Sequence, residues 1–508
     1  MSHISFQTLG SALVLALLAA CSDQSTVSAP PATPDSSPPP AAAAPVAQAV
    51  AEVVQTRAGA VRGEMTVDDV VGVSARIFRG IPYAAPPEGD LRWRPPQPVE
   101  PWQGVRDATQ WPDRCPQGSS SMGESGAISE DCLYLNVVTA AQTVEDKLPV
   151  MVFFHGGGLT TGTGNSPTYT HPSLPSKGVV LLTVNSRLGP MGYLAHPALS
   201  AEDENGVSGN YGTLDLRASL QWVQENIEAF GGDPDNVTIF GESGGGTKTI
   251  SQMASPLTEG LFHKAIVQSG SALVSPQAGT MLETAEETGE RLVAALGIAE
   301  SDDILMEMRS KSWEEIIEAV GGEDVRFRAS VVVDGYIIPD TVHNIFSQGL
   351  QHDVPLIVGA NAGERSLQAD VPLMGNLHSS TASSNTYLYN FTQVPLTWRE
   401  EPCVAFHGLE LPYVFGSVPI GVDSTTMLFL SRGGGCSSSE PQVDDIDMQV
   451  SDQASTVWAQ FAKTGDPSVP GLIEWEPYTE QNNRYLNIGS PLQMATGIQD
   501  SYTPPPGR

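Results

Sequence analysis

A serine with unusual neighbours, Ser243, stands in the segment GESGGG at residues 241–246, directly after the apolar run VTIF. Gly241 and Gly245 frame it in a G-x-S-x-G pattern, which exposes a serine hydroxyl when it forms a tight turn between a strand and a helix. Because glycine lacks a Cβ, the backbone can bend sharply there and other segments can approach it closely. The pattern predicts a nucleophilic serine, although taken alone it fits an ordinary glycine-rich turn equally well.

A second glycine run lies at residues 156–158, in the segment FFHGGGLTTG, and also follows an apolar run. When a serine attacks an ester, the carbonyl oxygen becomes negatively charged, and free backbone amides can stabilise that charge in the transition state. Loss of one such donor typically costs about 10²- to 10³-fold in rate. Since an HGGG run beside a G-x-S-x-G turn is more specific than either motif alone, the two together predict an oxyanion hole.

Two further residues could complete the chemistry, because a serine needs an imidazole to accept its proton and a carboxylate to orient that imidazole. His407 follows the apolar stretch CVAF and precedes a glycine, so we expect it at the junction of a strand and a loop. Glu364 comes just beyond the run LIVG, although among 58 acidic residues it also fits a solvated loop carboxylate beside Arg365. The order Ser243, Glu364, His407 is the order of nucleophile, acid and base in α/β-hydrolases.

Alternating strand-like and helix-like segments surround these residues. The runs LPVMVFF, GVVLLTV, VTIF, KAIVQ and VPLIVG are typical of buried strands, and residues 214–231 have helical periodicity. They predict an α/β fold with a large central, mostly parallel twisted sheet and helices on both faces. The length of 508 residues allows one such domain with a helical insertion. In such sheets reactive groups gather at the carboxyl ends of the strands.

The charge of the chain is strongly acidic, with 25 Lys and Arg against 58 Asp and Glu and a formal net charge of −33. No basic stripe is available to neutralise phosphates, which excludes nucleic acid as a partner and argues against charge-driven docking on anionic lipid. The acidic excess is typical of a highly soluble surface. No C-x-x-C or clustered Cys/His spacing suggests a metal, so we expect neither a metal nor a cofactor.

The N-terminal segment differs from the rest of the chain. The apolar run ALVLALLAA, residues 12–20, has signal-peptide length and ends in LAAC, where Cys21 resembles the lipidated cysteine of a bacterial lipobox. Residues 1–21 are therefore predicted to be a signal peptide with a lipobox, residues 22–52 a Pro/Ala/Ser-rich linker, and residues 53–503 the globular domain. We expect an exported protein, periplasmic or anchored in the outer membrane through Cys21. Plain secretion with Cys21 removed is the alternative.

Four more cysteines remain, Cys115, Cys132, Cys403 and Cys436, and they permit three pairings. Proximity in the sequence favours a disulfide between Cys115 and Cys132. A disulfide between Cys403 and Cys436 is then the pairing that remains.

Longer segments resemble the type-B carboxylesterase/lipase family, which also contains the cholinesterases. The resemblance lies, in order, in FRGIPYAAPPEGDLRWRPPQP, EDCLYLNV, NSRLGPMGYL, WVQENIEAFGGDPDNVTIFGESGGG, VDGYIIPD, GANAGE, HGLELPYVFG and WAQFAKTGDPS. It covers roughly residues 53–490. It implies an α/β-hydrolase fold and a carboxylic-ester hydrolase that needs no cofactor, takes a small-molecule ester and forms an acyl-enzyme.

The resemblance also assigns roles to single residues. Ser243 is expected to be the nucleophile, Glu364 the acid and His407 the base. The oxyanion hole is expected at the amides of Gly157, Gly158 and Gly244, and the family often has alanine in place of Gly244, so we expect little loss from the glycine. The resemblance also implies a disulfide between Cys115 and Cys132. It further implies two buried ion pairs, Arg92 with Glu130 and Arg187 with Asp215. Glu242 is expected to influence the pKa of His407.

The main departure from the family is the short segment between Glu364 and His407, which spans 43 positions and includes the polar stretch HSSTASSNTYLYN. We expect the helices that roof the site in relatives to be missing here, which predicts a shallow, open pocket that admits bulky acyl or alcohol groups. Two other functions are compatible with the fold. One is a catalytically silent binding or adhesion protein, and the other is a lipase that acts on lipid surfaces. The complete set of reactive residues favours the ester hydrolase.

Overall fold

The computed structural model describes residues 50–69, 72–118, 126–298, 303–322, 325–422, 430–436 and 441–505. The predicted signal peptide, Cys21 and residues 22–49 of the predicted linker lie outside the described residues. The described strands are β1 (Val53–Gln55), β2 (Ala60–Arg62), β3 (Glu64–Asp68), β4 (Val73–Pro82), β5 (Val105–Asp107), β6 (Tyr134–Thr139), β7 (Leu148–Phe154), β8 (Val180–Val184), β9 (Gly232–Glu242), β10 (Lys264–Gln268), β11 (Thr280–Met281), β12 (Val332–Val333), β13 (Leu356–Asn361), β14 (Thr386–Phe391), β15 (Arg484–Ile488) and β16 (Gln493–Thr496).

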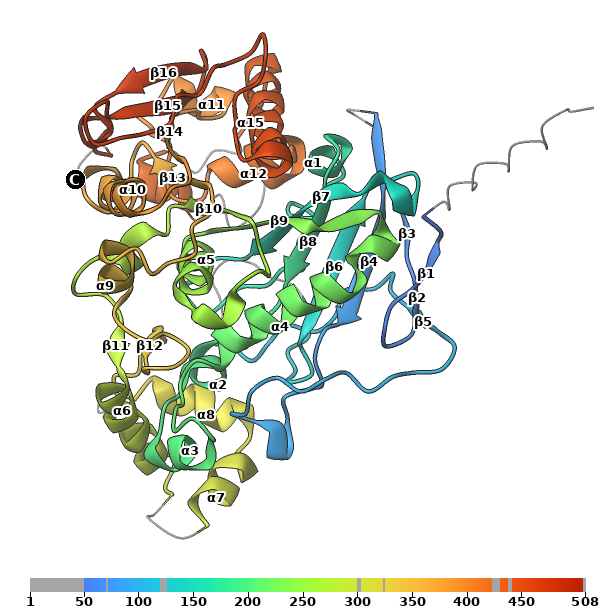
Figure 1. Cartoon of the computed structure of the whole chain (residues 1–508), viewed down its shortest axis with the longest axis vertical. Coiled ribbons are helices and arrows are strands. Elements are labelled where there is room, and N and C mark those ends of the chain that lie inside the picture. The colour runs from blue at the N-terminus through green and yellow to red at the C-terminus, as the bar shows by residue number, and fades with distance from the viewer. Residues whose placement is uncertain are drawn as a thin grey trace, which may run out of the picture. The chain divides into compact units, whose positions relative to one another are not determined.

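A large mixed sheet forms the centre, with eleven strands in the order β16-β15-β14-β13-β10-β9-β7-β8-β6-β4-β3 (Figure 1). Every neighbouring pair from β15 to β8 is parallel, whereas the strands at both edges pair antiparallel. Parallel strands buried on both faces need apolar side chains on both, which is why the predicted strands are continuous apolar runs. The α/β-hydrolase architecture expected from the sequence is confirmed.

Helices cover both faces of the sheet, and strand β7 shows why both faces are apolar. Its residues Val150, Val152 and Phe154 belong to the core under α4, α5, α9 and α10, while Met151 and Phe153 belong to the core under α1, α12 and α15. The described α-helices are α1 (Ser173–Ser176), α2 (Gly189–Tyr193), α3 (Pro197–Glu202), α4 (Tyr211–Asn226), α5 (Gly244–Ala254), α6 (Leu282–Ala295), α7 (Ile304–Ser310), α8 (Trp313–Val320), α9 (Val342–Ser347), α10 (Asp370–Thr381), α11 (Leu396–Arg399), α12 (Glu410–Phe415), α13 (Val418–Gly421) and α15 (Asp445–Thr464).

A separate helical layer contains α2, α3, α6, α7 and α8, at the bottom of Figure 1. It has a core of its own, in which Trp93, Met191, Leu292, Met308 and Ile316 are buried together. The short strands β11 and β12 pair with each other and not with the central sheet. This layer is the helical insertion that the length of the chain suggested.

The segment between Glu364 and His407 contributes a helix and a buried strand to the fold. Residues 370–381 form α10, and residues 386–391 form β14, all of whose residues are buried between β13 and β15. Within HSSTASSNTYLYN the two tyrosines of TYLYN, Tyr387 and Tyr389, are residues typical of strands, a signal that the polar residues before them obscured.

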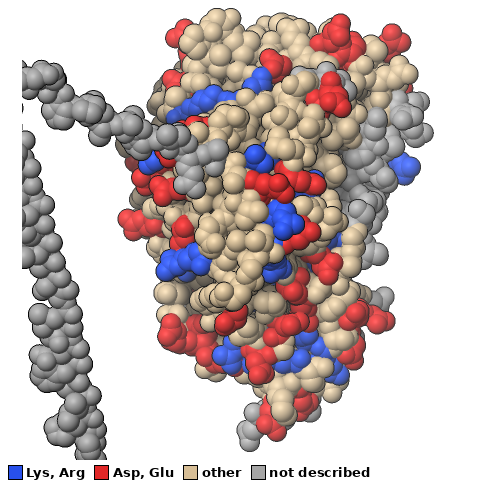
Figure 2. Space-filling model, turned by 90° about the vertical axis from the view of Figure 1, so that its right-hand side faces the viewer, with Lys and Arg blue, Asp and Glu red and all other residues tan. Residues whose placement is uncertain are grey.

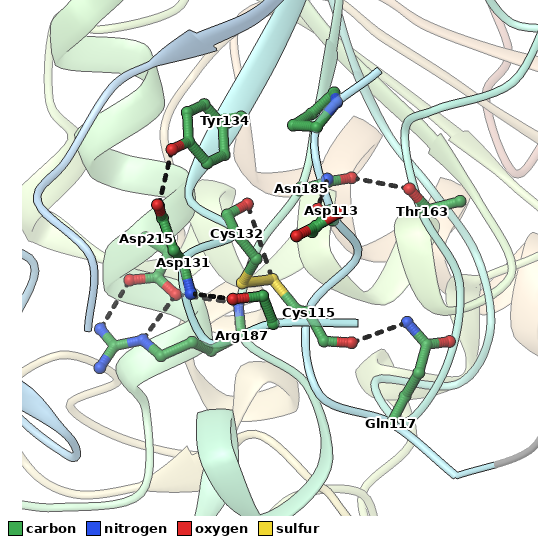
Figure 3. Close-up of a disulfide and its surroundings, with 12 residues drawn as sticks. Asp113, Cys115, Gln117, Asp131, Cys132, Tyr134, Thr163, Asn185, Arg187 and Asp215 are labelled. Atoms are coloured by element: carbon green, nitrogen blue, oxygen red, sulfur yellow. Dashed lines mark hydrogen bonds and ion pairs between the residues drawn. A yellow bond between two sulfur atoms is a disulfide. The ribbon is translucent and has the colours of Figure 1, made fainter. Parts of the chain in front are cut away.

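The domain contains two disulfides among its described residues, one between Cys115 and Cys132 and the other between Cys403 and Cys436. The first is fully buried and closes a loop with a sequence separation of 17 residues (Figure 3). In the same view Gln117 Nε2 donates to the carbonyl of Cys115 at 3.0 Å. The disulfide therefore fixes the backbone from which the Gln117 side chain extends.

Two buried ion pairs expected from the family resemblance are present. Arg187 contacts Asp215 with both Nε and Nη2, at 2.9 Å and 2.6 Å, and both side chains are at most 2% exposed (Figure 3). Arg92 Nε lies 2.8 Å from Glu130 Oε2. Two bonds from one guanidinium to one carboxylate hold both groups in a fixed plane, so these pairs serve the scaffold.

The surface of the described residues is acidic without a continuous basic area on the face that Figure 2 shows, where Lys and Arg are interspersed with Asp and Glu. In the described part of the chain, no helix has the length and apolar character needed to cross a membrane.

Candidate active site

Ser243 occupies a tight turn between β9 and α5. Its φ of 58° and ψ of −121° are a strained conformation for a residue with a Cβ, and such strain persists only where surrounding contacts impose it. One of those contacts is the bond from Ser243 N to the carbonyl of Gln268, at 2.9 Å. A Cβ on Gly270 would overlap Ser243 O, and one on Gly245 would overlap Phe154 O. The glycines are therefore needed for close packing of this turn against β7 and the end of β10.

The acid and the base expected from the sequence are in contact. His407 Nδ1 donates to Glu364 Oε1 at 2.6 Å, so in the neutral ring Nε2 is the nitrogen that can accept a proton. Glu364 follows β13 and is held by two more bonds, from the hydroxyl of Ser269 at 2.6 Å and from the amide of Asn361 at 2.9 Å. A carboxylate with three donors has little freedom to turn, so it fixes the ring plane and the tautomer of His407.

The prediction that His407 lies at the junction of a strand and a loop is wrong. Residues 403–406 form no strand, and His407 lies in a turn before α12. The carbonyl groups before His407 accept hydrogen bonds from a loop and from a side chain. Gly363 N donates to Ala405 O at 2.8 Å, and Asn361 Nδ2 donates to Phe406 O at 2.6 Å. Since these partners lie at the end of β13, Ala405 and Phe406 of the run CVAF are buried without joining the sheet.

Glu242 is the second carboxylate in contact with the imidazole of His407. Its Oε1 lies 3.2 Å from His407 Nε2, and its side chain is 7% exposed against 39% for His407. Burial raises the pKa of Glu242 to about 8, although the charge of His407 opposes this shift. Burial opposes the charged form of His407 as well, but Glu242 and Glu364 together raise its pKa to about 10.

A third buried carboxylate, Glu410, lies behind the pair at the start of α12. Asn361 Nδ2 donates to its Oε2 at 2.5 Å, and Gln268 Nε2 lies 3.3 Å from its Oε1. Burial, followed by the charge of Glu364, raises the pKa of Glu410 to about 7. His407 thus lies among three carboxylates, two of which have raised pKa values, a pattern found at functional sites.

The glycine run after β7 comes close to the turn that carries Ser243. Gly157 and Gly158 have φ values of 97° and 61°, which glycine adopts without strain. The amide nitrogen of Gly158 lies 2.5 Å from the position that a Cβ on Gly244 would take. No described residue accepts a hydrogen bond from the amides of Gly157, Gly158 or Gly244. These three predicted donors are therefore close together and available to an anionic oxygen beside Ser243.

The far end of this loop is anchored by two polar side chains. Gln117 bonds both backbone groups of Gly162, at 2.9 Å and 3.0 Å. Asn185 Oδ1 accepts from the amide of Gly164 at 2.8 Å and from the hydroxyl of Thr163 at 3.0 Å (Figure 3). Because Gln117 lies next to the Cys115 disulfide, that disulfide supports the loop indirectly.

The third contact of the catalytic set, between Ser243 Oγ and His407, stays a prediction. Among the described side chains the Ser243 hydroxyl forms no hydrogen bond with His407, whose Nε2 faces Glu242, the residue before the serine. Catalytic hydrogen bonds are often long without substrate and tighten when substrate binds. In the described residues, no group of three or more His, Cys, Asp and Glu side chains is placed to hold a metal ion.

Several residues of the site were not found from the sequence, among them Ser269, Asn361, Gln268 and Glu410. Each contacts a residue more than 45 positions away, and Asn361 also bonds Glu364 nearby. The only local signal was the serine after β10, in the segment QSGSA, at the carboxyl end of a strand next to β9.

Comparison with known proteins yields extensive matches. The model of the carboxylesterase family matches residues 50–374 and 366–503. Fumonisin B1 esterase of Sphingopyxis macrogoltabida is 35% identical over 505 residues, covering 87% of each chain. Para-nitrobenzyl esterase of Bacillus subtilis (strain 168) is 32% identical over 504 residues, covering 87% of this chain and 96% of the relative. A solved PNB esterase structure has a TM-score of 0.74 at 30% identity and covers 89% of this chain and 99% of its own.

Proposed function

This chain belongs to the carboxylesterase family and is a carboxylesterase, and we propose that it works through an acyl-enzyme on Ser243, with His407 as base and Glu364 as acid. The observation that supports this mechanism most directly is the 2.6 Å bond from His407 to Glu364, close to a strained serine turn and a free set of amides. Each of these features is required by the proposed chemistry.

Acylation begins when His407 Nε2 takes the proton of the Ser243 hydroxyl while Oγ bonds to the carbonyl carbon of the ester. The carbonyl π electrons move to its oxygen, which accepts hydrogen bonds from the amides of Gly157, Gly158 and Gly244. The oxyanion then collapses, the bond to the alkoxy oxygen breaks, and His407 returns its proton to the departing alcohol. Water then attacks the acyl group while His407 takes its proton. The bond to Ser243 Oγ breaks, His407 returns the proton to the serine, and the carboxylic acid is released.

An open entrance to the site is supported by the exposure of the imidazole. The His407 side chain is 39% exposed, although its carboxylate neighbours Glu242 and Glu364 are 7% and 13% exposed. We propose that the pocket admits esters with bulky acyl or alcohol groups. Because one relative is named as a fumonisin B1 esterase, fumonisin B1 joins small and aromatic esters in the substrate panel.

The test of the nucleophile compares wild-type enzyme with Ser243→Ala on p-nitrophenyl acetate. We expect turnover to fall by about 10⁶-fold, as is usual when such a serine is removed. Intact-mass measurement after rapid acid quenching should find an added acyl group on the wild type and none on Ser243→Ala. The matched control is Ser380→Ala, which removes an exposed hydroxyl from α10 and should leave turnover unchanged. Equal rates for Ser243→Ala and wild type would end the proposal.

The two other functions make different predictions in the same assays. A silent binding protein would show no turnover and no acyl adduct on any ester of the panel. A lipase would hydrolyse emulsified long-chain esters much faster than the same esters below their solubility limit. We expect saturation with soluble esters and no such increase at an interface.

Export through Cys21 is a separate proposal, supported by the segment ALVLALLAAC alone. Expression of the full chain with a labelled fatty acid should label the wild type and not Cys21→Ser. Label on neither protein, with the mature chain beginning after Cys21, would establish plain secretion instead.

A further inference from the structure

A buried lysine, Lys248, lies in the second turn of α5 and takes no part in the mechanism above. Its residue is 1% exposed, and no carboxylate forms an ion pair with it among the described residues. A lysine is almost never buried this fully unless its ammonium group has partners. The side chain extends from the helix that begins at the nucleophile toward the loop that carries the oxyanion hole.

Both partners of Lys248 belong to a single residue of that loop. Its Nζ donates to the carbonyl of His155 at 3.1 Å and lies 3.3 Å from His155 Nε2. His155 is the residue between β7 and the glycine run 156–158, and it is 2% exposed. Lys248 thus holds the loop at its first residue, as Gln117 holds it at Gly162.

The state of the His155 ring follows from its other contact. His155 Nδ1 lies 2.8 Å from the carbonyl oxygen of Gly156, which can only accept, so Nδ1 carries the hydrogen. Burial, followed by the charge of Lys248, holds the pKa of His155 well below its ordinary value, so the ring is neutral. Nε2 is then an acceptor, and Lys248 Nζ is the donor that it faces. Burial lowers the pKa of Lys248 to about 7, and the amine retains enough hydrogens for both bonds in either state.

The backbone contacts between α5 and the loop are tight. The amide of Gly158 packs on Gly244, and Phe154 O packs on Gly245. Gly162 leaves room for the His155 ring, since a Cβ there would overlap Nδ1. A displacement of His155 would therefore move Gly157 and Gly158 relative to Ser243, and a shift of about 1 Å in such geometry can cost about 10²-fold.

We propose that Lys248 is a positioning residue for the oxyanion hole, which it acts on through the backbone carbonyl and the ring of His155. This proposal rests on the proposed acyl-enzyme mechanism. The oxyanion hole stabilises the transition state more than the bound substrate, so loss of Lys248 should lower kcat and change KM little. A residue that only stabilised the fold would instead lower the amount of active enzyme at unchanged kcat per site.

The main experiment uses Lys248→Met, which keeps the length and the apolar volume of the side chain and removes Nζ. We expect kcat per titrated active site to fall about 10- to 100-fold and KM to stay within about twofold of the wild-type value. This decrease in kcat is no larger than the decrease of about 10²- to 10³-fold that follows the loss of one oxyanion donor. A trifluoromethyl ketone, which forms an oxyanion on Ser243, should inhibit less well by a similar factor. The corresponding alcohol, which forms none, should bind as before. Equal losses for ketone and alcohol, or an unchanged kcat, would overturn the proposal.

The matched control is Ser251→Ala, which lies one turn further along α5 and is also 1% exposed. Its hydroxyl donates only to Lys248 O inside the helix, at 2.7 Å, so its loss should reduce stability slightly and leave kcat unchanged. A second variant, His155→Asn, keeps a donor near Gly156 O and removes the acceptor for Lys248. The effect of Lys248→Met should be smaller in the His155→Asn background, because part of the shared contact is already gone.

Failure of folding is covered by the same set of variants. If Lys248→Met does not accumulate as folded protein, Lys248→Gln and His155→Asn are measured in its place, and unchanged kcat in both would refute the positioning role. Failure of the nucleophile itself is recognised separately, because Ser243→Ala would then retain activity whatever the Lys248 variants do.

Discussion

The replacement Glu242→Gln tests the electrostatics of the site most directly. Glu242 Oε1 lies 3.2 Å from His407 Nε2, and a carboxylate at that distance stabilises the protonated imidazole. Only the neutral imidazole can take the proton of Ser243, so a raised pKa of His407 moves the acid limb of the activity profile to higher pH. Removing the negative charge should lower that pKa and restore activity at lower pH.

The size of the shift can be worked from the distance. Two unit charges 3.2 Å apart interact by about 1.3 kcal/mol in water and by about 5 kcal/mol at an effective dielectric constant of 20, which corresponds to about 1 to 4 pKa units. The His407 side chain is 39% exposed, and the raised pKa of Glu242, about 8, leaves it partly protonated near neutral pH. Both facts favour the lower part of the range. We therefore expect a downward shift of about 1 to 2 pH units.

The assay is the pH dependence of kcat/KM for a soluble ester, with acid release followed at constant pH. The apparent pKa belongs to the Glu242–His407 pair, and the plateau at high pH should also fall severalfold because the variant has a weaker base. Glu410→Gln should shift the limb in the same direction by less, since Glu410 contacts Asn361 and Gln268 and not the imidazole. Glu476→Gln, at an exposed carboxylate paired with Arg484, should not shift it. An acid limb that stays in place or moves upward in Glu242→Gln would refute the reasoning.

Three further replacements test the geometry. In Gly244→Ala the new Cβ would lie 2.5 Å from Gly158 N, so the loop must move, and we expect kcat to fall about tenfold or more with KM little changed; wild-type kcat would show that the loop adapts freely. In Ser269→Ala, Glu364 loses one of its three donors, and kcat/KM should fall about tenfold at a similar melting temperature, because a hydrogen bond to a charged group contributes about 1.5–3 kcal/mol. Arg187→Met leaves Asp215 buried without its partner, and denaturant unfolding should give a loss of about 3–5 kcal/mol. A loss below about 1 kcal/mol would mean that water or a shift of Asp215 compensates.

The strands nearest the site could be predicted because their signal is local. Central parallel strands such as β7, β8 and β9 are buried on both faces, so burial alone requires the continuous apolar runs that the sequence shows. The same rule failed for residues 403–406, where Ala405 and Phe406 are buried beside the end of β13 without joining the sheet. Apolar runs report burial, and the hydrogen-bond partners that decide between strand and loop come from elsewhere in the chain.

The residues of the candidate site also divide into those with a local signal in the sequence and those without one. The positions of Ser243 and of the glycine run could be predicted because a strained turn and a close backbone approach each demand glycine at fixed short spacings. Little loss was expected from having glycine at position 244, where the family often has alanine, and only the distance to Gly158 N shows that a Cβ there would need room. That distance depends on where β7 ends relative to α5, which no local pattern encodes.

The polar groups that support the catalytic residues are the least predictable part, and the physics explains why. Glu410 and Lys248 are ordinary charged residues in the sequence, and Glu242 was singled out only through the family resemblance; burial by distant segments is what raises or lowers their pKa values. A buried charge is costly unless it is paired or neutralised, so a fold that retains three such groups around one serine turn must supply each with specific partners. Asn361 illustrates how few residues this takes, because its amide nitrogen bonds Glu364 while its side chain bonds Phe406 O and Glu410. One residue at the end of β13 therefore fixes Glu364, the segment before His407 and Glu410 at once, and its replacement would disturb all three together.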